Sequence, residues 1–198
     1  MTNKYGIIIL AAGSSSRLGK PKQLLRYNNQ SLLQHIVNIA LEAAIGPVVV
    51  VLGAEADLIK KDLDETKIIT VINKNWQEGM GSSIRSGLQQ FTDRCPDAEG
   101  VIFTVCDQPF ITSTLLYQLL ATYQKTKNPV IASVYEDTQG TPAFFHRDIF
   151  PELSALKADK GAKQIINNHK DHIGLVSFPM GSRDIDTESD YVQLLQNN

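Results

Sequence analysis

The feature of this sequence that most restricts its fold is a series of short apolar runs that alternate with amphipathic stretches. The runs are rich in β-branched residues and are bounded by glycine, proline or polar residues. Because they are apolar at nearly every position, they are typical of strands that are buried on both faces, as in parallel sheets. We therefore predict strands over residues 5–10, 47–52, 68–72, 101–105 and 130–134.

The amphipathic stretches between these runs predict helices. The clearest begins at Ser31, carries apolar residues at helical spacing and stops before Gly46-Pro47. The predicted helices cover residues 31–44, 56–63, 82–91, 112–123, 159–168 and 188–196. This βα order, with right-handed crossovers, predicts a three-layer α/β/α sandwich with a mainly parallel, Rossmann-like central sheet.

One segment departs from the regular order. Residues 139–145 contain Gly140 and Pro142 and predict a turn that leads into a further β segment. No repeat, low-complexity tract or linker divides the chain. Since a chain of 198 residues suits one domain of ordinary size, we expect residues 1–198 to form a single domain.

Composition excludes several classes of protein. The formal net charge of −2 at pH 7 gives no basic surface of the kind that binds nucleic acid. The two cysteines and four histidines show no metal-ligand spacing. The apolar stretch near the N-terminus is too short to span a bilayer and has no cleavage-site pattern. We therefore expect a cytoplasmic protein with neither nucleic acid nor a membrane as a partner.

The first predicted strand runs directly into a loop of small residues, LAAGSSSRLGKPK, from Leu10 to Lys22. Ligands of open α/β sheets bind beyond the carboxyl ends of strands, where small residues let backbone N–H groups approach phosphate oxygens. Arg17 and Lys22 add the positive charge that a polyphosphate requires. An ordinary turn with two solvated cations is the alternative. The combination of small residues, arginine and Pro-Lys after a buried strand favours phosphate binding.

Two familiar phosphate loops do not fit this segment. A Walker A loop is excluded because one extra residue separates Gly13 from Gly19 and because Pro21 follows Lys20. A dinucleotide fingerprint is excluded because Ser15 occupies the position of its second glycine. Pro21 also disfavours a helix that starts directly in the loop. The loop is therefore expected to wrap its ligand in another way.

A second glycine-containing segment follows the third predicted strand. Gly79, Met80 and Gly81 precede Ser82 and Ser83, and together they lead into a predicted helix. A helix N-terminus offers unpaired N–H groups and a partial positive charge. Capping by either serine would explain the serines without a ligand, but it would not explain the two glycines.

Acidic residues stand at two further places. Asp107 follows the strand predicted over 101–105, at the edge of the sheet where ligands bind. Because Mg²⁺ needs few carboxylates besides phosphate oxygens, Asp107 is a candidate metal ligand as well as an ordinary turn residue. In the tail, Asp184 and Asp186 precede Thr187, which could cap the last helix. An acidic helix start, with Asp190 in the first turn, is the other reading of this tail.

These motifs carry a resemblance to a known family. The segment from Leu10 to Lys22 resembles the signature Leu-Ala-Ala-Gly-x-x-x-Arg-x-Gly-x-Pro-Lys of nucleotidyltransferases with a glycosyltransferase-A-like fold. Within these it is most similar to the molybdenum cofactor cytidylyltransferases, as are the Gly-Met-Gly-Ser-Ser segment and the Asp-x-Pro element at Asp107. Residues 140–145 and 159–162 also match family elements and would lie toward the acceptor. The tail departs mildly, because the family typically has Asp-x-Asp-Thr-Pro-Glu-Asp and this chain has no proline there.

The resemblance implies a MobA-like NTP transferase that moves CMP from CTP to the phosphate of molybdopterin and releases pyrophosphate. It implies catalytic roles for Lys22, Arg17 and Asp107, and Mg²⁺ held by Asp107 and Asp186, with Asp184 as the alternative second ligand. The nucleotide contacts that it implies are those of Leu10, Ala12, Gly13, Arg17, Lys22, Gly81, Ser82 and Ser83.

Other functions remain alternatives. Transfer of GMP to the same pterin and transfer to a sugar phosphate use related enzymes. Ala12 favours CTP, since GTP-using relatives typically carry Ala-Gly-Gly where this chain has Ala-Ala-Gly. A non-catalytic accessory protein that delivers the cofactor to a molybdenum hydroxylase, such as xanthine dehydrogenase, is a separate class. The presence of Arg17, Lys22, Asp107 and Asp186 argues against a degenerate binder, because a scaffold needs no metal carboxylates.

Overall fold

The computed structural model describes residues 4–196 and is built around a seven-stranded sheet with the order β5-β4-β1-β6-β8-β7-β9. Residues 1–3 and 197–198, which the single-domain prediction includes, lie outside the described residues. The strands of this sheet are β1 (Tyr5–Ala11), β4 (Val48–Leu52), β5 (Ile69–Ile72), β6 (Gly100–Val105), β7 (Val130–Tyr135), β8 (Thr138–His146) and β9 (Ile173–Ser177).

The sheet is mostly parallel, as predicted. β5, β4, β1 and β6 run in one direction, and β9 pairs with β7 in parallel. β8 runs antiparallel to both of its neighbours, β6 and β7. The central strands β1, β4 and β6 are almost completely buried, which explains why their sequences are continuous β-branched runs and do not alternate.

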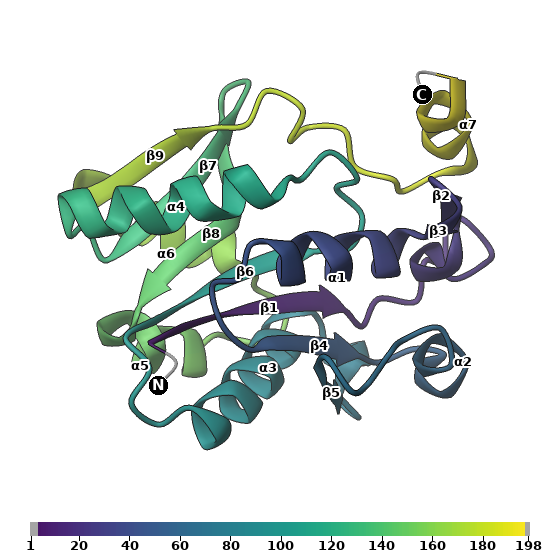
Figure 1. Ribbon diagram of the computed structural model, residues 1–198. Coiled ribbons are helices and arrows are strands. Elements are labelled where there is room, and N and C mark those ends of the chain that lie inside the picture. The colour runs from purple at the N-terminus through teal and green to yellow at the C-terminus, as the bar shows by residue number, and fades with distance from the viewer. Residues whose placement is uncertain (1–3, 197–198) are drawn as a thin grey trace.

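Helices cover both faces of this sheet, which confirms the predicted three layers (Figure 1). On one face α1 (Leu32–Glu42) and α4 (Ser113–Thr126) contribute to one apolar core, together with the short α2 (Ala56–Lys60). On the other face the core includes α3 (Met80–Arg94), α5 (Phe150–Ser154) and α6 (Ala162–Asn168). None of the helices within residues 4–196 combines the length and apolar character needed to cross a membrane.

A third, smaller apolar cluster joins the C-terminal helix to the start of the chain. The helix α7 (Glu188–Gln196) places Leu194 against Leu25 and Tyr27, and Ile185 packs beside them. Tyr27 belongs to a short hairpin of β2 (Arg26–Tyr27) and β3 (Gln30–Ser31), which the sequence did not predict. Figure 1 shows α7 next to this hairpin, beyond the carboxyl end of β1.

Several boundaries and elements differ from the sequence prediction. α3 begins at Met80 with Gly79 as its N-cap, so neither Ser82 nor Ser83 caps it. Thr112 does cap α4, and its side chain accepts a hydrogen bond from the N–H of Leu115. The edge strand β9 and the short α5 were not predicted. β9 alternates between buried and exposed residues at the edge of the sheet, and therefore lacks the continuous apolar run that identifies the central strands.

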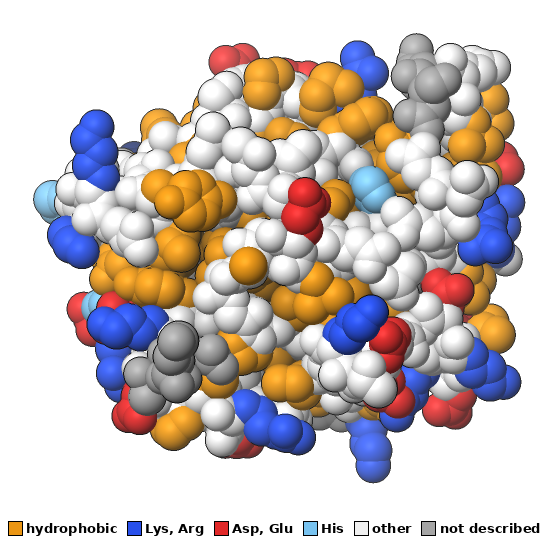
Figure 2. Space-filling view, in the orientation of Figure 1, with side chains coloured by type: hydrophobic (Ala, Val, Ile, Leu, Met, Phe, Trp, Pro, Cys, Tyr) orange, Lys and Arg blue, Asp and Glu red, His pale blue; other side chains and the backbone are white. Residues whose placement is uncertain are grey.

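Charged side chains are spread over the surface. On the face shown in Figure 2, lysine and arginine side chains are interspersed with acidic ones and form no continuous basic area there.

Candidate functional site

Four charged side chains from three distant segments meet beyond the carboxyl ends of β1 and β6. The Nζ atom of Lys22 lies 2.6 Å from Oδ2 of Asp107 and 2.9 Å from Oδ1 of Asp186. The Nη2 atom of Arg17 lies 2.9 Å from Oδ2 of Asp186. β1 and β6 are neighbours in the sheet, so the loop after β1 and Asp107 after β6 necessarily share one edge. The structure therefore brings together the four residues that the sequence singled out.

The cluster ranges from a sheltered end to an open end. The side chains of Lys22 and Asp107 are only 14% and 21% exposed, whereas that of Arg17 is 71% exposed. Burial alone would lower the pKa of Lys22, but the charge and hydrogen bond of Asp107 and the hydrogen bond of Asp186 outweigh it and raise that pKa. The hydrogen bond from Lys22 and the nearby charge of Arg17 lower the pKa of Asp186. Both partners are therefore charged at neutral pH.

Local structure sets the position of Lys22. Pro21 has extended backbone angles, φ −60° and ψ 114°, and Lys22 opens a short 3-10 helix, η1 (Lys22–Leu24). The backbone N–H of Lys22 donates to the hydroxyl of Ser15, 3.0 Å away. This bond ties the residue that carries the buried ammonium to the glycine loop.

Asp186 is positioned by the start of the last helix. The N–H groups of Asp186 and Thr187 both donate to one carboxylate oxygen of Asp190, and the N–H of Asp190 donates to the Thr187 hydroxyl. Just before it, the N–H of Ile185 donates to the backbone oxygen of Asp107 over 2.9 Å. The cap at Thr187 thus orders the start of α7, and the separate bond from Ile185 brings the neighbouring Asp186 close to Asp107.

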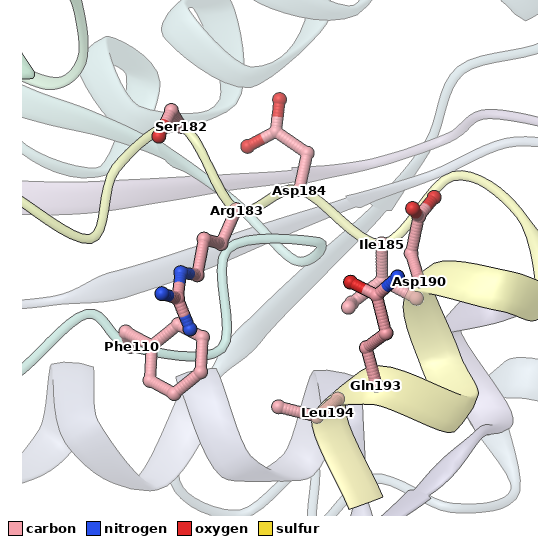
Figure 3. A pocket seen from close by; sticks show the side chains of 8 residues that line it. All are labelled: Phe110, Ser182, Arg183, Asp184, Ile185, Asp190, Gln193 and Leu194. Atoms are coloured by element: carbon pink, nitrogen blue, oxygen red, sulfur yellow. The ribbon is translucent and has the colours of Figure 1, made fainter. Parts of the chain in front are cut away.

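Asp184 is placed differently from Asp186. Figure 3 shows its side chain pointing away from that of Arg183, at the rim of a cavity of about 390 Å³ beside α7. Desolvation by the surrounding protein and the charge of Asp107 raise the pKa of Asp184 to about 6, even though part of the side chain remains accessible to solvent. Asp186 is the tail carboxylate that pairs with both cations.

A cavity of about 330 Å³ opens beside the charged cluster. It is bounded by the loop after β1, the end of β6 and the residues around the start of α3. A smaller cavity of about 130 Å³ shares Gly13 and Lys22 with it and extends to Arg17 and Asp186. The predicted site residues that line the larger cavity are Leu10, Ala12, Gly13, Lys22, Ser83 and Asp107.

Gly81 and Ser82 have other contacts. The N–H of Gly81 donates to the backbone oxygen of Ala158, 2.9 Å away. The Ser82 hydroxyl donates to the backbone oxygen of Gly79 and accepts a hydrogen bond from Asn73. Neither residue is among those that line the two cavities at the charged cluster. Both help to hold the start of α3 in place, and their predicted contact with the nucleotide stays a prediction.

Trp76 and Gln23 are among the residues that line the larger cavity and that the sequence analysis did not assign to the site. Trp76 is the sole tryptophan of the chain and stands close to the glycines of the second segment, a signal that could have been used. Gln23 is 1% exposed. A polar residue between Lys22 and two leucines was the available hint, but the pattern alone does not distinguish a buried amide from a solvated one.

The donor set can be tested for a divalent cation. Carboxylate oxygens of Asp107 and Asp186 converge on one point, where they hold the ammonium of Lys22. Within residues 4–196 no group of three or more His, Cys, Asp or Glu side chains is arranged to hold a metal ion. Two converging carboxylates, completed by phosphate oxygens and water, are a coordination set that suits Mg²⁺. The residues present therefore fit a metal that arrives with a phosphate ligand.

Comparison with known proteins places the chain in a family. The chain is 28% identical to nicotine blue oxidoreductase of Paenarthrobacter nicotinovorans, with 95% of each protein covered. It is 26% identical to molybdenum cofactor guanylyltransferase of Vibrio cholerae, over 86% of this chain and 80% of that protein. The structure of Rv0371c of Mycobacterium tuberculosis in complex with manganese matches with a TM-score of 0.83 and 25% identity, over 98% of this chain and all of that one. The model of the MobA-like NTP transferase domain matches residues 7–173, and the chain therefore belongs to this family of nucleotidyltransferases.

Proposed function

We propose that this nucleotidyltransferase moves CMP from CTP to the phosphate of molybdopterin, with Mg²⁺ as the metal and pyrophosphate as the second product. The observation that carries the proposal is the meeting of Lys22, Arg17, Asp107 and Asp186 beside a cavity at the end of β1. Relatives named molybdenum cofactor guanylyltransferases support the acceptor. The manganese complex of Rv0371c supports a divalent metal in this family. We expect the reaction to occur in the cytoplasm, where nucleoside triphosphates are available.

In this reaction an oxygen of the acceptor phosphate attacks the α-phosphorus of CTP, the bond to the β-phosphate oxygen breaks, and pyrophosphate leaves. The protein performs little covalent chemistry, so positioning and charge neutralisation dominate. Lys22 neutralises the charge that develops on the α-phosphoryl oxygens, and the exposed Arg17 holds the β- and γ-phosphates. Asp107 and Asp186 would hold the metal, which when bound supplies positive charge to the phosphates.

The preference for CTP is proposed from the shape of the larger cavity. Ala12, Gly13 and Trp76 all line this cavity. A glycine in place of Ala12, as in Ala-Gly-Gly loops, would lack the methyl group and leave more room. The methyl group therefore favours the smaller pyrimidine base. GTP is the alternative donor, because guanylyltransferases are among the relatives.

A pyrophosphate-release assay with each of the four nucleoside triphosphates, with and without molybdenum cofactor, tests the proposal. We expect release with CTP only, and only when the cofactor is present. Release with GTP would make GTP the donor in place of CTP. Release when a sugar phosphate is supplied in place of molybdenum cofactor would make the sugar phosphate the acceptor. Co-purification with an apo form of a molybdenum hydroxylase such as xanthine dehydrogenase, without release from any triphosphate, would favour the accessory role and contradict the proposal.

A further inference from the structure

Gln23 is a buried polar residue whose side-chain amide hydrogen-bonds to the segment from Ala11 to Ser15. The residue is 1% exposed, and its Nε2 atom donates to two backbone oxygens, that of Ala11 over 2.8 Å and that of Gly13 over 2.9 Å. Its Oε1 atom lies 3.5 Å from the hydroxyl of Ser15, which in turn accepts the N–H of Lys22. One amide thus connects both ends of the bend after β1 to the helix turn that carries Lys22.

These bonds fix the direction of the loop's donors. In a trans peptide the N–H of the following residue points opposite to the carbonyl oxygen. Because the carbonyls of Ala11 and Gly13 point toward Gln23, the N–H groups of Ala12 and Ser14 point away from it. Ala12, Gly13 and Ser14 all line the larger cavity, while Gly13 itself is exposed. Ala11 is also held by the pairing of β1 with β4, so the carbonyl of Gly13 depends more on the amide, and its rotation toward the site would bring a negative dipole against phosphate oxygens.

Two backbone hydrogen bonds also support the loop, from the N–H of Ala54 to the oxygen of Ala12 and from the N–H of Leu18 to the oxygen of Ser15. Ser15 has a positive φ of 54°, a conformation that side-chain-bearing residues adopt only when their surroundings enforce it. The Ser15 hydroxyl is held between Gln23 and the N–H of Lys22. The bend and the catalytic lysine are therefore parts of one hydrogen-bonded unit, with Gln23 at its buried end.

We propose that Gln23 is a positioning residue that holds the glycine loop in the form that accepts the triphosphate moiety of the donor. It acts through the loop backbone and through Lys22. The proposal rests on the proposed function, since it names a further determinant of the same site.

The test compares Gln23→Leu, which keeps the volume and removes both donated hydrogen bonds, with the wild-type protein. Binding of CTP and of inorganic tripolyphosphate, each with magnesium, is measured by calorimetry. We expect both to weaken by about tenfold, the size of one to two lost oriented hydrogen bonds. Equal losses are expected because Gln23 is proposed to act on the triphosphate moiety, which CTP and tripolyphosphate share, and not on the base, which tripolyphosphate lacks. Ser133→Ala is the matched control, because it removes the buried hydrogen bond from Ser133 on β7 to the Pro142 oxygen on β8 and leaves the loop untouched.

Two further variants separate positioning from stability. Gln23→Glu keeps the shape but turns an acceptor toward the two carbonyls, and it should bind tripolyphosphate at least as weakly as Gln23→Leu near pH 8. A buried carboxyl has a raised pKa, so lowering the pH to about 6 protonates it and restores one donor. Partial recovery of binding, relative to the wild-type protein at each pH, is therefore expected for Gln23→Glu and not for Gln23→Leu. If Gln23→Leu does not fold, Ser15→Ala at a half-buried loop position takes its place in the test, and it should weaken tripolyphosphate binding by about threefold.

The outcomes divide clearly. Folded Gln23→Leu and Ser15→Ala proteins that bind tripolyphosphate as tightly as the wild-type protein would overturn the positioning role and leave the proposed function intact. A loss that is equally large in Ser133→Ala would also overturn it, because general destabilisation would then be the cause. A wild-type protein that binds neither CTP nor tripolyphosphate and releases no pyrophosphate would overturn the proposed function, and the role of Gln23 with it.

Discussion

Two glycine-containing segments reach the candidate site, and they use glycine for opposite purposes. At Gly13, in the loop after β1, a Cβ atom would meet nothing within 4 Å. At Gly81, in the first turn of α3, a Cβ atom would lie 2.2 Å from the backbone oxygen of Lys157. Gly79, with φ of 120°, would approach the Ala158 oxygen to 2.5 Å. At these glycine positions the first segment is open and the second is packed against residues 157–160, although Gly79, Met80 and Ser83 also line the larger cavity.

The difference shows the limit of what a glycine indicates. The sequence tells that no side chain is present at that position, but it does not tell whether a ligand or another part of the chain lies beside it. Next to Gly13 the space is open, and Gly13 is one of the residues that line the larger cavity. Next to Gly81 it is backbone of residues 157–160, which the chain reaches much later. Substitutions in the two segments should therefore affect different properties, chemistry in the first and stability in the second.

The largest effect is expected at the charged end of the first segment. Lys22→Ala and Asp107→Ala should each reduce pyrophosphate release by about a hundredfold or more, because each removes a group that contacts the reacting phosphates or their metal. The variants should remain folded, since these side chains lie at the edge of the sheet and outside its apolar cores. Steady-state kinetics together with circular dichroism test this, and near-normal rates in both variants would defeat the mechanism.

In the second segment the expected loss is one of stability. Gly81→Ala forces a methyl group against the backbone oxygens of Lys157 and Lys160, which cannot move aside as a flexible side chain could. The free energy of unfolding should fall by about 2 kcal/mol or more, as for other overpacked positions. Urea denaturation measures this. Unchanged stability would mean that α3 and residues 157–160 separate easily, and the proposed contrast between the segments would fail.

The smallest effect, and the one that sharpens the contrast, is expected for Gly13→Ala. The free energy of unfolding should change by less than about 0.5 kcal/mol, because the added methyl group enters open space. CTP binding should weaken by about tenfold, since that methyl group occupies the cavity wall where phosphates approach the backbone. Calorimetric titration with magnesium and CTP gives the affinity. A variant that is destabilised and still binds normally would reverse the assignment of the two segments.

How much of the fold and of the candidate site could be predicted from sequence depends on how far apart in the chain the contacting residues lie. The charged cluster was accessible because parallel strands end at one edge, so residues after β1 and β6 must be neighbours. The choice of Asp186 over Asp184 came from the motif alone. The helix cap at Thr187 now accounts for the placement of Asp186.

The missed features share a dependence on distant segments. The first turn of α3 is shaped by residues 157–160, and no local pattern around Gly81 reports that contact. β9 lies at an edge of the sheet, and only one of its faces is covered. Buried and exposed residues therefore alternate along it, and it lacks the apolar run that identifies a buried strand. The burial of Gln23 depends on how the glycine loop folds back over it, which spacing does not encode.

The ion pairs of Lys22 have a consequence for which form of the nucleotide the site accepts. Lys22 and Arg17 together balance the charges of Asp107 and Asp186, so the four side chains sum to zero. On the proposed function, a bare triphosphate would claim the two cations and leave two carboxylates facing its own oxygens. A triphosphate that is already complexed with a divalent ion brings its own positive charge. The two carboxylates then face that ion in place of Lys22 and Arg17, and the repulsion is avoided. On the proposed function, this charge balance would disfavour binding of the metal-free nucleotide before any chemistry begins.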